Sequence, residues 1–411
     1  MKRLILLLLL KSVRGVQLIL NEFYGNFSDS LENETVSSAA FTEARAKLSH
    51  TAFIELNQKA VVELFYKDKH PLFKGFRLLA IDGSKIALPN SKEIRRYFGV
   101  ITNRNHKKTF GSYTGALISV LYDPLGKIVL DGQIAKRKSY EGDLAKKHLE
   151  HTKEGDILIT DRGYSSYYWF ALLLSLKRNF IARCTESFLK PVNEFFASDE
   201  TDKIVTLRAP SGKINMAKKE GLPLEIKVRL VKVILSTGEV EVLATSLTDH
   251  KEFPHEDFKE LYNLRWGVEG FYGLIKDRLE LENFSGKTVE SVKQDFFSTL
   301  FLTGIETILT EEATEKLKQR KEKSKGSNRW SKKGEGNRAE QKVNRAVSFS
   351  AIKNRAIELF YEEKDTDKLE AKLTALFLTK PISKQTHDRP REKITDSKKI
   401  IHRKQNKKSV F

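Results

Sequence analysis

Hydrophobic positions recur at helical spacing in the first part of the chain. Between Leu18 and Phe65 the apolar residues are mostly three or four positions apart, the period at which side chains share one face of a helix. A shorter apolar run, residues 4–10, comes before them, and Lys11 follows it at once. Such a run is too short to cross a bilayer and lacks a cleavage site. Residues 1–70 are therefore predicted to form a helical region, with a buried helix at its start.

Short apolar runs replace the helical pattern from Phe76 onwards. The first run ends in Ile81-Asp82-Gly83-Ser84, and the run at 156–160 ends in Thr160-Asp161-Arg162-Gly163. An apolar run bounded by turn residues indicates a buried strand. Each aspartate is therefore predicted at the tip of a strand.

Further strands and helices are expected around these two runs. Residues 116–122 and 128–130 flank the turn sequence Asp-Pro-Leu-Gly and predict a hairpin. Residues 141–151 and 167–176 predict helices, and 180–182 predicts a strand. Alternation of strands and helices is typical of an α/β or α+β layered domain.

A β-rich insertion is predicted from about 187 to 246. Its apolar, β-branched runs are residues 204–207, 224–228, 231–235 and 240–244. Two long helices are predicted after it, at 256–281 and 289–309.

The chain becomes polar beyond Glu311. Residues 316–337 are rich in Lys, Ser, Gly and Glu and predict a linker that need not fold. A helical pattern returns at 351–377, and a basic tail starts at Lys384. The predicted domains are thus 1–70 (helical N-terminal region), 71–312 (the mixed domain with its insertion) and 313–411 (linker, helices and tail).

Charge changes this picture by pointing to a polyanionic partner. The formal net charge is +19, and residues 311–411 hold 28 Lys and Arg against 15 Asp and Glu. Basic segments bind along phosphates by releasing counterions, although a basic pI also occurs in proteins that are simply soluble. The basic N-terminal helices fit a DNA-end-binding module or a plain helical bundle equally well. Cys184 is the lone cysteine, which excludes an internal disulfide and a cysteine zinc site and fits a reducing cytosol.

Four polar residues of the predicted helix 256–281 fall on one face. Tyr262, Arg265, Glu269 and Lys276 are separated by 3, 4 and 7 positions, which places them together at 3.6 residues per turn. Such a face is either a solvated stripe with an i,i+4 ion pair or one wall of a phosphate site. We favour the phosphate site, in which Glu269 completes a set of acids while Arg265 and Lys276 hold phosphates.

Three acids suit a magnesium site. Asp82, Asp161 and Glu269 offer carboxylate oxygens, the ligands that Mg²⁺ prefers. Three carboxylates can hold two ions about 4 Å apart for an in-line displacement at phosphorus. His148 and His151 share a helix edge at i,i+3, but no third ligand accompanies them in the sequence.

The motifs together resemble one enzyme family. Tyr262-x2-Arg265-x3-Glu269-x6-Lys276 matches the Y-R-E-K signature of DDE transposases of insertion-sequence family four. The blocks around Asp82 and Asp161 resemble that family's two acidic blocks, and the likeness runs from about Leu4 to Thr374. The resemblance implies a ribonuclease-H-like mixed sheet flanked by helices, with a β-strand insertion before the Glu-bearing helix. Relatives often carry more residues before the first apolar helix, so the resemblance also implies a shortened or late-starting chain.

The resemblance further implies an activity and its partners. Members of the family bind the terminal inverted repeats of their element, pair two ends in a homodimeric synaptic complex, nick the DNA and join 3′-OH ends to target DNA. It implies two Mg²⁺ ions, with Mn²⁺ as a substitute, and a cytosolic enzyme acting on double-stranded DNA. Trp266 stands where relatives stabilise a flipped base, and ordinary packing is its alternative role. Arg162 is expected either to contact phosphate or to pair with a carboxylate.

Two other functions are compatible with these residues. A structure-specific nuclease would share the core and cleave DNA without joining a 3′-OH to a new strand. A DNA-binding protein derived from a transposase would be expected to lack one of the catalytic acids, and all three are present here.

Overall fold

The computed structural model describes residues 1–10, 15–25, 36–67, 70–105, 108–235, 238–326, 340–360 and 366–383. The chain divides into two compact units, one formed by Met1–Val61 with Ile275–Phe411 and the other by Val62–Leu274. Each unit has its own hydrophobic cluster of buried side chains. The domain limits expected from the sequence (1–70, 71–312 and 313–411) stay a prediction beside this division.

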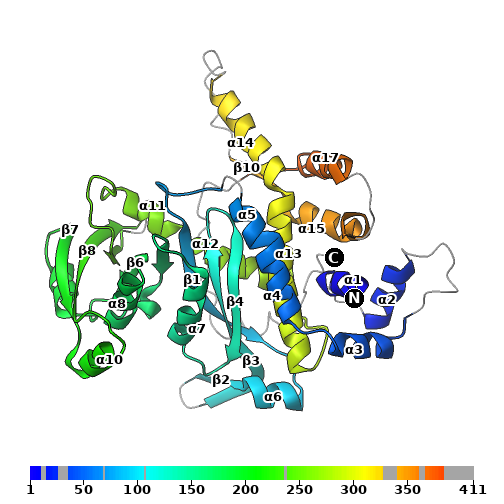
Figure 1. The fold of residues 1–411 in the computed structure, drawn as a ribbon, viewed down its shortest axis with the longest axis horizontal. Coiled ribbons are helices and arrows are strands. Elements are labelled where there is room, and N and C mark those ends of the chain that lie inside the picture. Colours follow the sequence, from blue (N-terminus) through cyan, green and yellow to red (C-terminus); the bar gives the residue numbers. More distant parts are fainter. Residues whose placement is uncertain are drawn as a thin grey trace. The chain divides into compact units, whose positions relative to one another are not determined.

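A mixed sheet forms the centre of the unit Val62–Leu274 (Figure 1). β1 (Leu78–Ala87) pairs antiparallel with β3 (Lys108–Asp123) on one side and parallel with β5 (Ile157–Thr160) on the other. β4 (Ile128–Lys136) follows β3 antiparallel, and β6 (Asn179–Cys184) follows β5 in parallel. The resulting order β4-β3-β1-β5-β6, in which β3 alone runs against the rest, is the ribonuclease-H-like topology. This confirms the predicted fold class.

Continuous apolar runs explain why the central strands lie inside. All four residues of β5 are fully buried, as expected for a parallel strand covered on both faces. Helix α7 (Glu141–His148) packs on β1, β3 and β4, and α8 (Tyr167–Ser175) packs on β6. Short helical turns follow at η2 (Leu149–His151) and η3 (Arg162–Tyr164). The predicted hairpin and the helices at 141–151 and 167–176 are thereby confirmed.

The predicted β-rich insertion extends the same sheet. β9 (Val240–Thr245) pairs antiparallel with β6, β8 (Glu225–Ile234) with β9, and β7 (Asp202–Arg208) with β8. The expectation of two runs at 224–228 and 231–235 was wrong, because β8 is one strand that continues through Arg229. That side chain is fully buried because it forms an ion pair with Asp202. Three short helical elements of the insertion were not predicted: α9 (Lys190–Ala197), η4 (Ser211–Lys213) and α10 (Ile214–Lys219).

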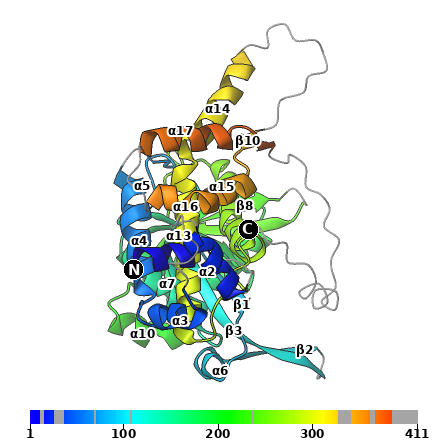
Figure 2. The same cartoon turned by 90° about the vertical axis from the view of Figure 1, so that its right-hand side faces the viewer.

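A ribbon at the other edge of the sheet was also not predicted. β2 (Val100–Asn105) pairs antiparallel with the first half of β3, and the two strands project together from the sheet beside α6 (Lys92–Phe98) (Figure 2). Ser91 caps α6 by accepting a hydrogen bond from the Ile94 amide.

The expectation that β1 ends at Asp82 was wrong. Its parallel pairing with β5 stops at Ile81, but its antiparallel pairing with β3 continues to Ala87. The strand continues because β3 supplies backbone partners over its whole length, so Gly83 lies within a strand and not in a turn. At Asp82, the pairing of β1 with β5 has ended, while its pairing with β3 continues.

The helix expected at 256–281 is divided into three segments. α11 (Asp257–Asn263) and α12 (Trp266–Gly273) are separated by a turn at Leu264 and Arg265, and a π-helix, η5 (Leu274–Arg278), follows. Asn263 and Gly267 border the break, and both residue types are poor helix formers. The prediction of one continuous helix was therefore wrong.

A long buried helix, α13 (Val289–Leu309), is the centre of the other unit and confirms the predicted helix at 289–309. α1 (Lys2–Leu9) and α4 (Thr51–Asn57) pack against it. Five leucines of α1 are buried, which confirms the buried helix expected there. The other helices of the N-terminal region are α2 (Val16–Gly25), α3 (Ser38–Ala46), η1 (Gln58–Val62) and α5 (Glu63–Lys67), the last of which belongs to the sheet-containing unit.

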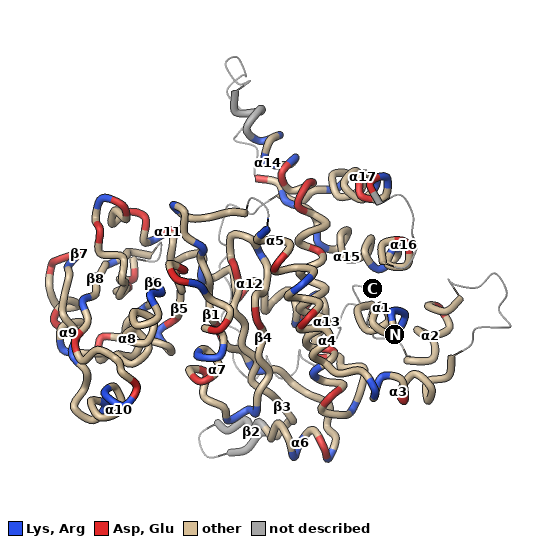
Figure 3. Tube along the Cα trace, viewed as in Figure 1, with Lys and Arg blue, Asp and Glu red and all other residues tan. Residues whose placement is uncertain are grey.

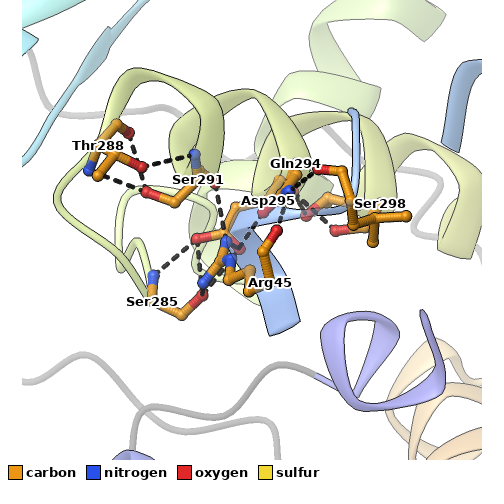
Figure 4. Close-up of polar contacts among 9 residues, drawn as sticks. Arg45, Ser285, Thr288, Ser291, Gln294, Asp295 and Ser298 are labelled. Atoms are coloured by element: carbon orange, nitrogen blue, oxygen red, sulfur yellow. Dashed lines mark hydrogen bonds and ion pairs between the residues drawn. The ribbon is translucent and has the colours of Figure 1, made fainter. Parts of the chain in front are cut away.

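A buried ion pair joins α3 to α13 (Figure 4). The Arg45 guanidinium donates to Asp295 at 2.8 Å and to the Gln294 side chain at 2.7 Å. Asp295 also accepts from the amide and hydroxyl of Ser285. A buried charge is tolerated only when it is paired and hydrogen-bonded, so this cluster fixes where α3 lies along α13.

The start of the predicted linker is helical, which corrects that expectation for residues 316–326. α14 (Glu311–Gly326) carries acidic and basic residues along its length (Figure 3), and Glu312 pairs with Lys316 one turn on. Ala313 and Leu317 are buried against α17, so tertiary contacts stabilise a helix that its polar composition did not suggest. The rest of the linker to 337 and the tail from Lys384 lie outside the described residues.

The helical pattern expected at 351–377 is confirmed by three helices. They are α15 (Arg345–Asn354), α16 (Ala356–Phe360) and α17 (Thr366–Phe377), accompanied by the short strands β10 (Gln341–Lys342) and β11 (Ile382–Ser383). Among the described residues, no helix is both long enough and apolar enough to span a membrane.

Candidate active site

Asp82 and Asp161 lie next to each other on neighbouring strands: Asp82 is in β1, and Asp161 directly follows β5. In the parallel pairing of β1 with β5, Ile81 lies opposite Thr160, and each aspartate is the next residue along its strand. Neighbouring strands are about 4.8 Å apart. The structure therefore brings these two predicted acids together at one end of the sheet.

A chain of buried polar groups holds the backbone of Asp82. The Tyr272 hydroxyl of α12 donates to the Asp82 carbonyl at 2.7 Å, and the Ser119 hydroxyl lies 3.2 Å from the same oxygen. Behind Ser119, His148 Nε2 is 2.9 Å from its Oγ, and His148 Nδ1 is 2.7 Å from Asp131. Both ring nitrogens of His148 are engaged, which leaves none for the metal role considered for it.

Glu269 comes to the site from α12, which packs on β1. Its carboxylate accepts a hydrogen bond from Arg265 Nη1 at 2.8 Å, and the side chain is 42% exposed. The Tyr262 hydroxyl donates to Asp161 across 3.3 Å. Tyr262, Arg265, Glu269 and Asp161 thus form one connected group.

The part of the predicted polar face that carries Tyr262 and Arg265 is buried and is not a solvated stripe. Tyr262 and Arg265 are each 3% exposed, and the Arg265 guanidinium lies 5.6 Å from the Tyr262 ring centre. The Arg265 Nε is buried and has no hydrogen-bond partner among the described residues. A buried donor without a partner is rare in folded proteins, and the Arg265 Nε is such a group beside Glu269.

The electrostatics of the site show an excess of negative charge. Burial raises the pKa of Asp82 to about 6; the Gly83 amide and Arg265 oppose this shift, while Glu269 and Glu141 add to it. Burial also raises the pKa of the Tyr262 phenol, and Asp161 adds to that effect. Carboxylates that are partly buried next to one another favour protonation or a bound cation.

The remaining predicted residues have different surroundings. Trp266 is 53% exposed, with the Arg265 guanidinium 4.5 Å from its ring. Arg162 is exposed in η3, directly after Asp161. Lys276 lies in η5, in the part of the chain assigned to the other unit, and its role stays a prediction.

Glu141 is a site residue that the sequence did not reveal. It begins α7, and its carboxyl carbon lies 3.0 Å from where a side chain on Gly83 would start. Its only signal in the sequence is an acid in the first turn of a helix, which is common. Its closeness to Asp82 depends on how α7 packs on β1.

The candidate ligand atoms are of the chemical type that binds a hard divalent cation. Asp82, Asp161, Glu269 and Glu141 offer carboxylate oxygens, which Mg²⁺ and Mn²⁺ prefer. Within the described ranges no three Asp, Glu, His or Cys side chains are already arranged as a closed metal site. In this arrangement the Glu269 carboxylate accepts a hydrogen bond from Arg265.

Comparisons with known proteins show the family of this chain. Residues 74–303 match the family model described as "Transposase DDE domain". A curated relative, the transposase InsG for insertion sequence element IS4 of Escherichia coli (strain K12), is 25% identical over 274 residues, covering 64% of this chain. The matched segment spans 59% of that relative's length.

A solved structure shares a weaker likeness. A cryo-EM structure of the piggyBac transposase synaptic complex with hairpin DNA aligns over 92% of this chain and 75% of that chain, with a TM-score of 0.46 and 11% identity.

Proposed function

Because the chain belongs to the DDE transposase family, of the insertion-sequence family four type, we propose that it is a DNA transposase that cuts and rejoins phosphodiester bonds. The observation that supports the proposal is that Asp82 of β1 lies next to Asp161, which directly follows the neighbouring strand β5, with Glu269 on a helix packed against β1. All three acids lie within the family match.

Asp82, Asp161 and Glu269 would hold the metal ions. When bound, two Mg²⁺ ions, or Mn²⁺ in their place, supply the Lewis acidity that activates the attacking oxygen and stabilises the leaving oxygen. Tyr272 and Ser119 fix the backbone from which Asp82 projects. Positioning of this kind matters because a small displacement of a reacting group costs much of the rate.

Arg265 acts as the phosphate-binding residue of the site. Its Nε has no partner among the described residues, and its Nη1, which donates to Glu269, would be free to bind phosphate if Glu269 held a metal ion. A guanidinium can then donate two parallel hydrogen bonds to a phosphate. Lys276 and the exposed Arg162 are proposed as further phosphate contacts, and Trp266 as a stacking surface for a displaced base.

The partners that we propose are those implied by the family resemblance. The enzyme binds double-stranded DNA at the terminal inverted repeats of its element, pairs two ends as a homodimer, nicks the DNA and joins the freed 3′-OH ends to target DNA. Cut-and-paste transposition in the bacterial or archaeal cytosol is the biological outcome we propose.

The test uses DNA that carries the element's terminal repeats. Wild-type protein with Mg²⁺ is expected to cleave at the repeat and to join the 3′ end to a second DNA. Asp161→Asn keeps the size of the side chain but removes its charge, and should lower both steps by at least about 10³-fold. Glu154→Gln, at an exposed surface ion pair with Lys177, serves as the matched control.

Two results would contradict the proposal. Equal activity of wild type and Asp161→Asn would remove the acid from the chemistry. Cleavage without any joined product would indicate a nuclease that shares the same core.

A further inference from the structure

The surroundings of Gly83 leave little space for a side chain, whereas its backbone conformation is one that any residue adopts. It lies inside β1, where it pairs with Ser119 of β3 in regular register. A side-chain carbon built on it would stand 3.0 Å from Cδ and 3.2 Å from Oε1 of Glu141. At these distances the flexible end of the Glu141 side chain would have to shift by a few tenths of an ångström to admit a methyl group, so with glycine at position 83 the carboxylate can lie next to Asp82.

Glu141 has no protein partner for its charge. It is partly buried, and it forms no hydrogen bond or ion pair with any residue in the described part of the chain. By contrast, Glu241, a buried acid of β9, is neutralised by Arg183 at 2.9 Å. A partly buried carboxylate without a cationic partner is unfavourable unless a bound cation supplies the missing charge.

The Tyr164 hydroxyl gives a second and independent indication. Tyr164 is 5% exposed, and among the described residues its phenol oxygen has no partner in good hydrogen-bond geometry, although the Ser119 hydroxyl is near enough to lower its pKa. The charged groups around it are the carboxylates of Glu141, Asp82 and Asp161. The Ser119 hydroxyl nearby is already engaged by His148 and the Asp82 carbonyl. A buried hydroxyl among three acids is explained if a ligand of those acids is its missing partner.

We propose that Glu141 is a fourth metal-binding carboxylate of the site, acting beside Asp82, with the Tyr164 hydroxyl directed at the same ligand. The inference rests on the proposed function, because it assigns a ligand to the ions that function requires. Glu141 comes from a helix, a position independent of the strand that carries Asp82, so it can approach an ion from another direction.

The test measures Mn²⁺ binding by the full chain without DNA, using the paramagnetic signal of free Mn²⁺. Glu141→Gln keeps the shape of the side chain and removes its charge, and is expected to weaken Mn²⁺ binding about 10- to 100-fold. Gly83→Ala, which displaces the carboxylate, should weaken it as well. Glu150→Gln, on the exposed turn that follows α7, should bind Mn²⁺ as the wild type does.

Asp82→Asn separates the failure of this inference from that of the proposed function. If Asp82→Asn loses Mn²⁺ while Glu141→Gln binds it normally, Glu141 is not a ligand. If Asp82→Asn also binds normally, the metal site of the proposed function is wrong.

The Mg²⁺ dependence of DNA cleavage distinguishes ligation from a structural role. For Glu141→Gln the Mg²⁺ concentration giving half of the maximal rate should rise at least tenfold, with most of the rate recovered at saturation, and Glu141→Asp should recover part of the affinity. A rate lowered equally at every Mg²⁺ concentration would overturn the proposal in favour of a role in folding.

Discussion

At the scale of single residues, the site is distinguished by groups whose hydrogen-bonding or charge is incomplete. The Nε of Arg265 and the hydroxyl of Tyr164 are buried without partners among the described residues, and the pKa of Asp82 is raised to about 6 chiefly by burial. Several other buried charges are paired, as Arg229 is with Asp202 and Arg77 with Asp156. Unmatched groups that gather in one place indicate a site that is completed by a ligand.

Trp266 allows a prediction at this scale. Its ring is 53% exposed, so Trp266→Ala should change the free energy of unfolding by no more than about 0.5 kcal/mol. Stacking of a base on an aromatic ring contributes about 1–3 kcal/mol, so DNA cleavage by the variant should fall about 5- to 150-fold. Trp266→Phe should retain most of the rate. Wild-type cleavage by Trp266→Ala would show that the ring is an ordinary surface residue.

At the scale of elements, the close packing of two helical segments requires a glycine at a position that takes no part in the chemistry. α13 approaches the segment containing Val61 so closely that a side-chain carbon on Gly304 would lie 2.6 Å from Val61 Cγ1. Val61 is fully buried and cannot move aside. The glycine therefore sets the distance between these helices.

Gly304→Ala should for this reason destabilise the protein by about 1–3 kcal/mol, measured by urea unfolding. The matched control is Gly270→Ala in α12, where no heavy atom lies within 4 Å of the added carbon, and there the change should stabilise by about 0.5–1 kcal/mol. Val61→Ala combined with Gly304→Ala should recover part of the stability. If Gly304→Ala is as stable as the wild type, the two helices do not pack as closely as the structure shows.

The elements also show how far sequence patterns reach. The strand at 156–160, the helix at 289–309 and the buried first helix were all predictable, because apolar spacing within one segment decides them. α14 was not predictable, because its polar sequence is stabilised through two residues, Ala313 and Leu317, by packing against α17. The continuation of β1 past Asp82 likewise depends on the length of a different strand.

At the scale of the whole molecule, positive charge is concentrated toward the end of the sequence. The segment 384–411 holds 10 Lys and Arg and 3 Asp and Glu, within a chain of net charge +19. In the part of the chain that the structure describes, Lys and Arg are spread over both units (Figure 3). The terminal segment, with a net charge of +7 (10 − 3), is therefore one source of non-specific attraction to phosphates.

Ending the chain after Ser383 should accordingly weaken binding to DNA of arbitrary sequence. The slope of log affinity against log salt concentration should become shallower, by about 0.9 for each phosphate that the shortened chain no longer neutralises. Both quantities can be measured by fluorescence anisotropy at several salt concentrations. An unchanged slope would show that the tail does not bind phosphates, and replacing its basic residues by Gln in the full-length chain is the matched comparison.

The sequence by itself determined the family, through the motifs around Asp82, Asp161 and Glu269 and the spaced residues Tyr262 and Arg265. These motifs are readable because residues at fixed spacing on one helix or at one strand end share a direction in any fold that forms them. Only the tertiary structure decided that Glu141 faces Gly83 and that Glu269 is turned to Arg265. Such arrangements join segments far apart in the chain or select one of several side-chain directions, and only the packing of the elements makes that choice.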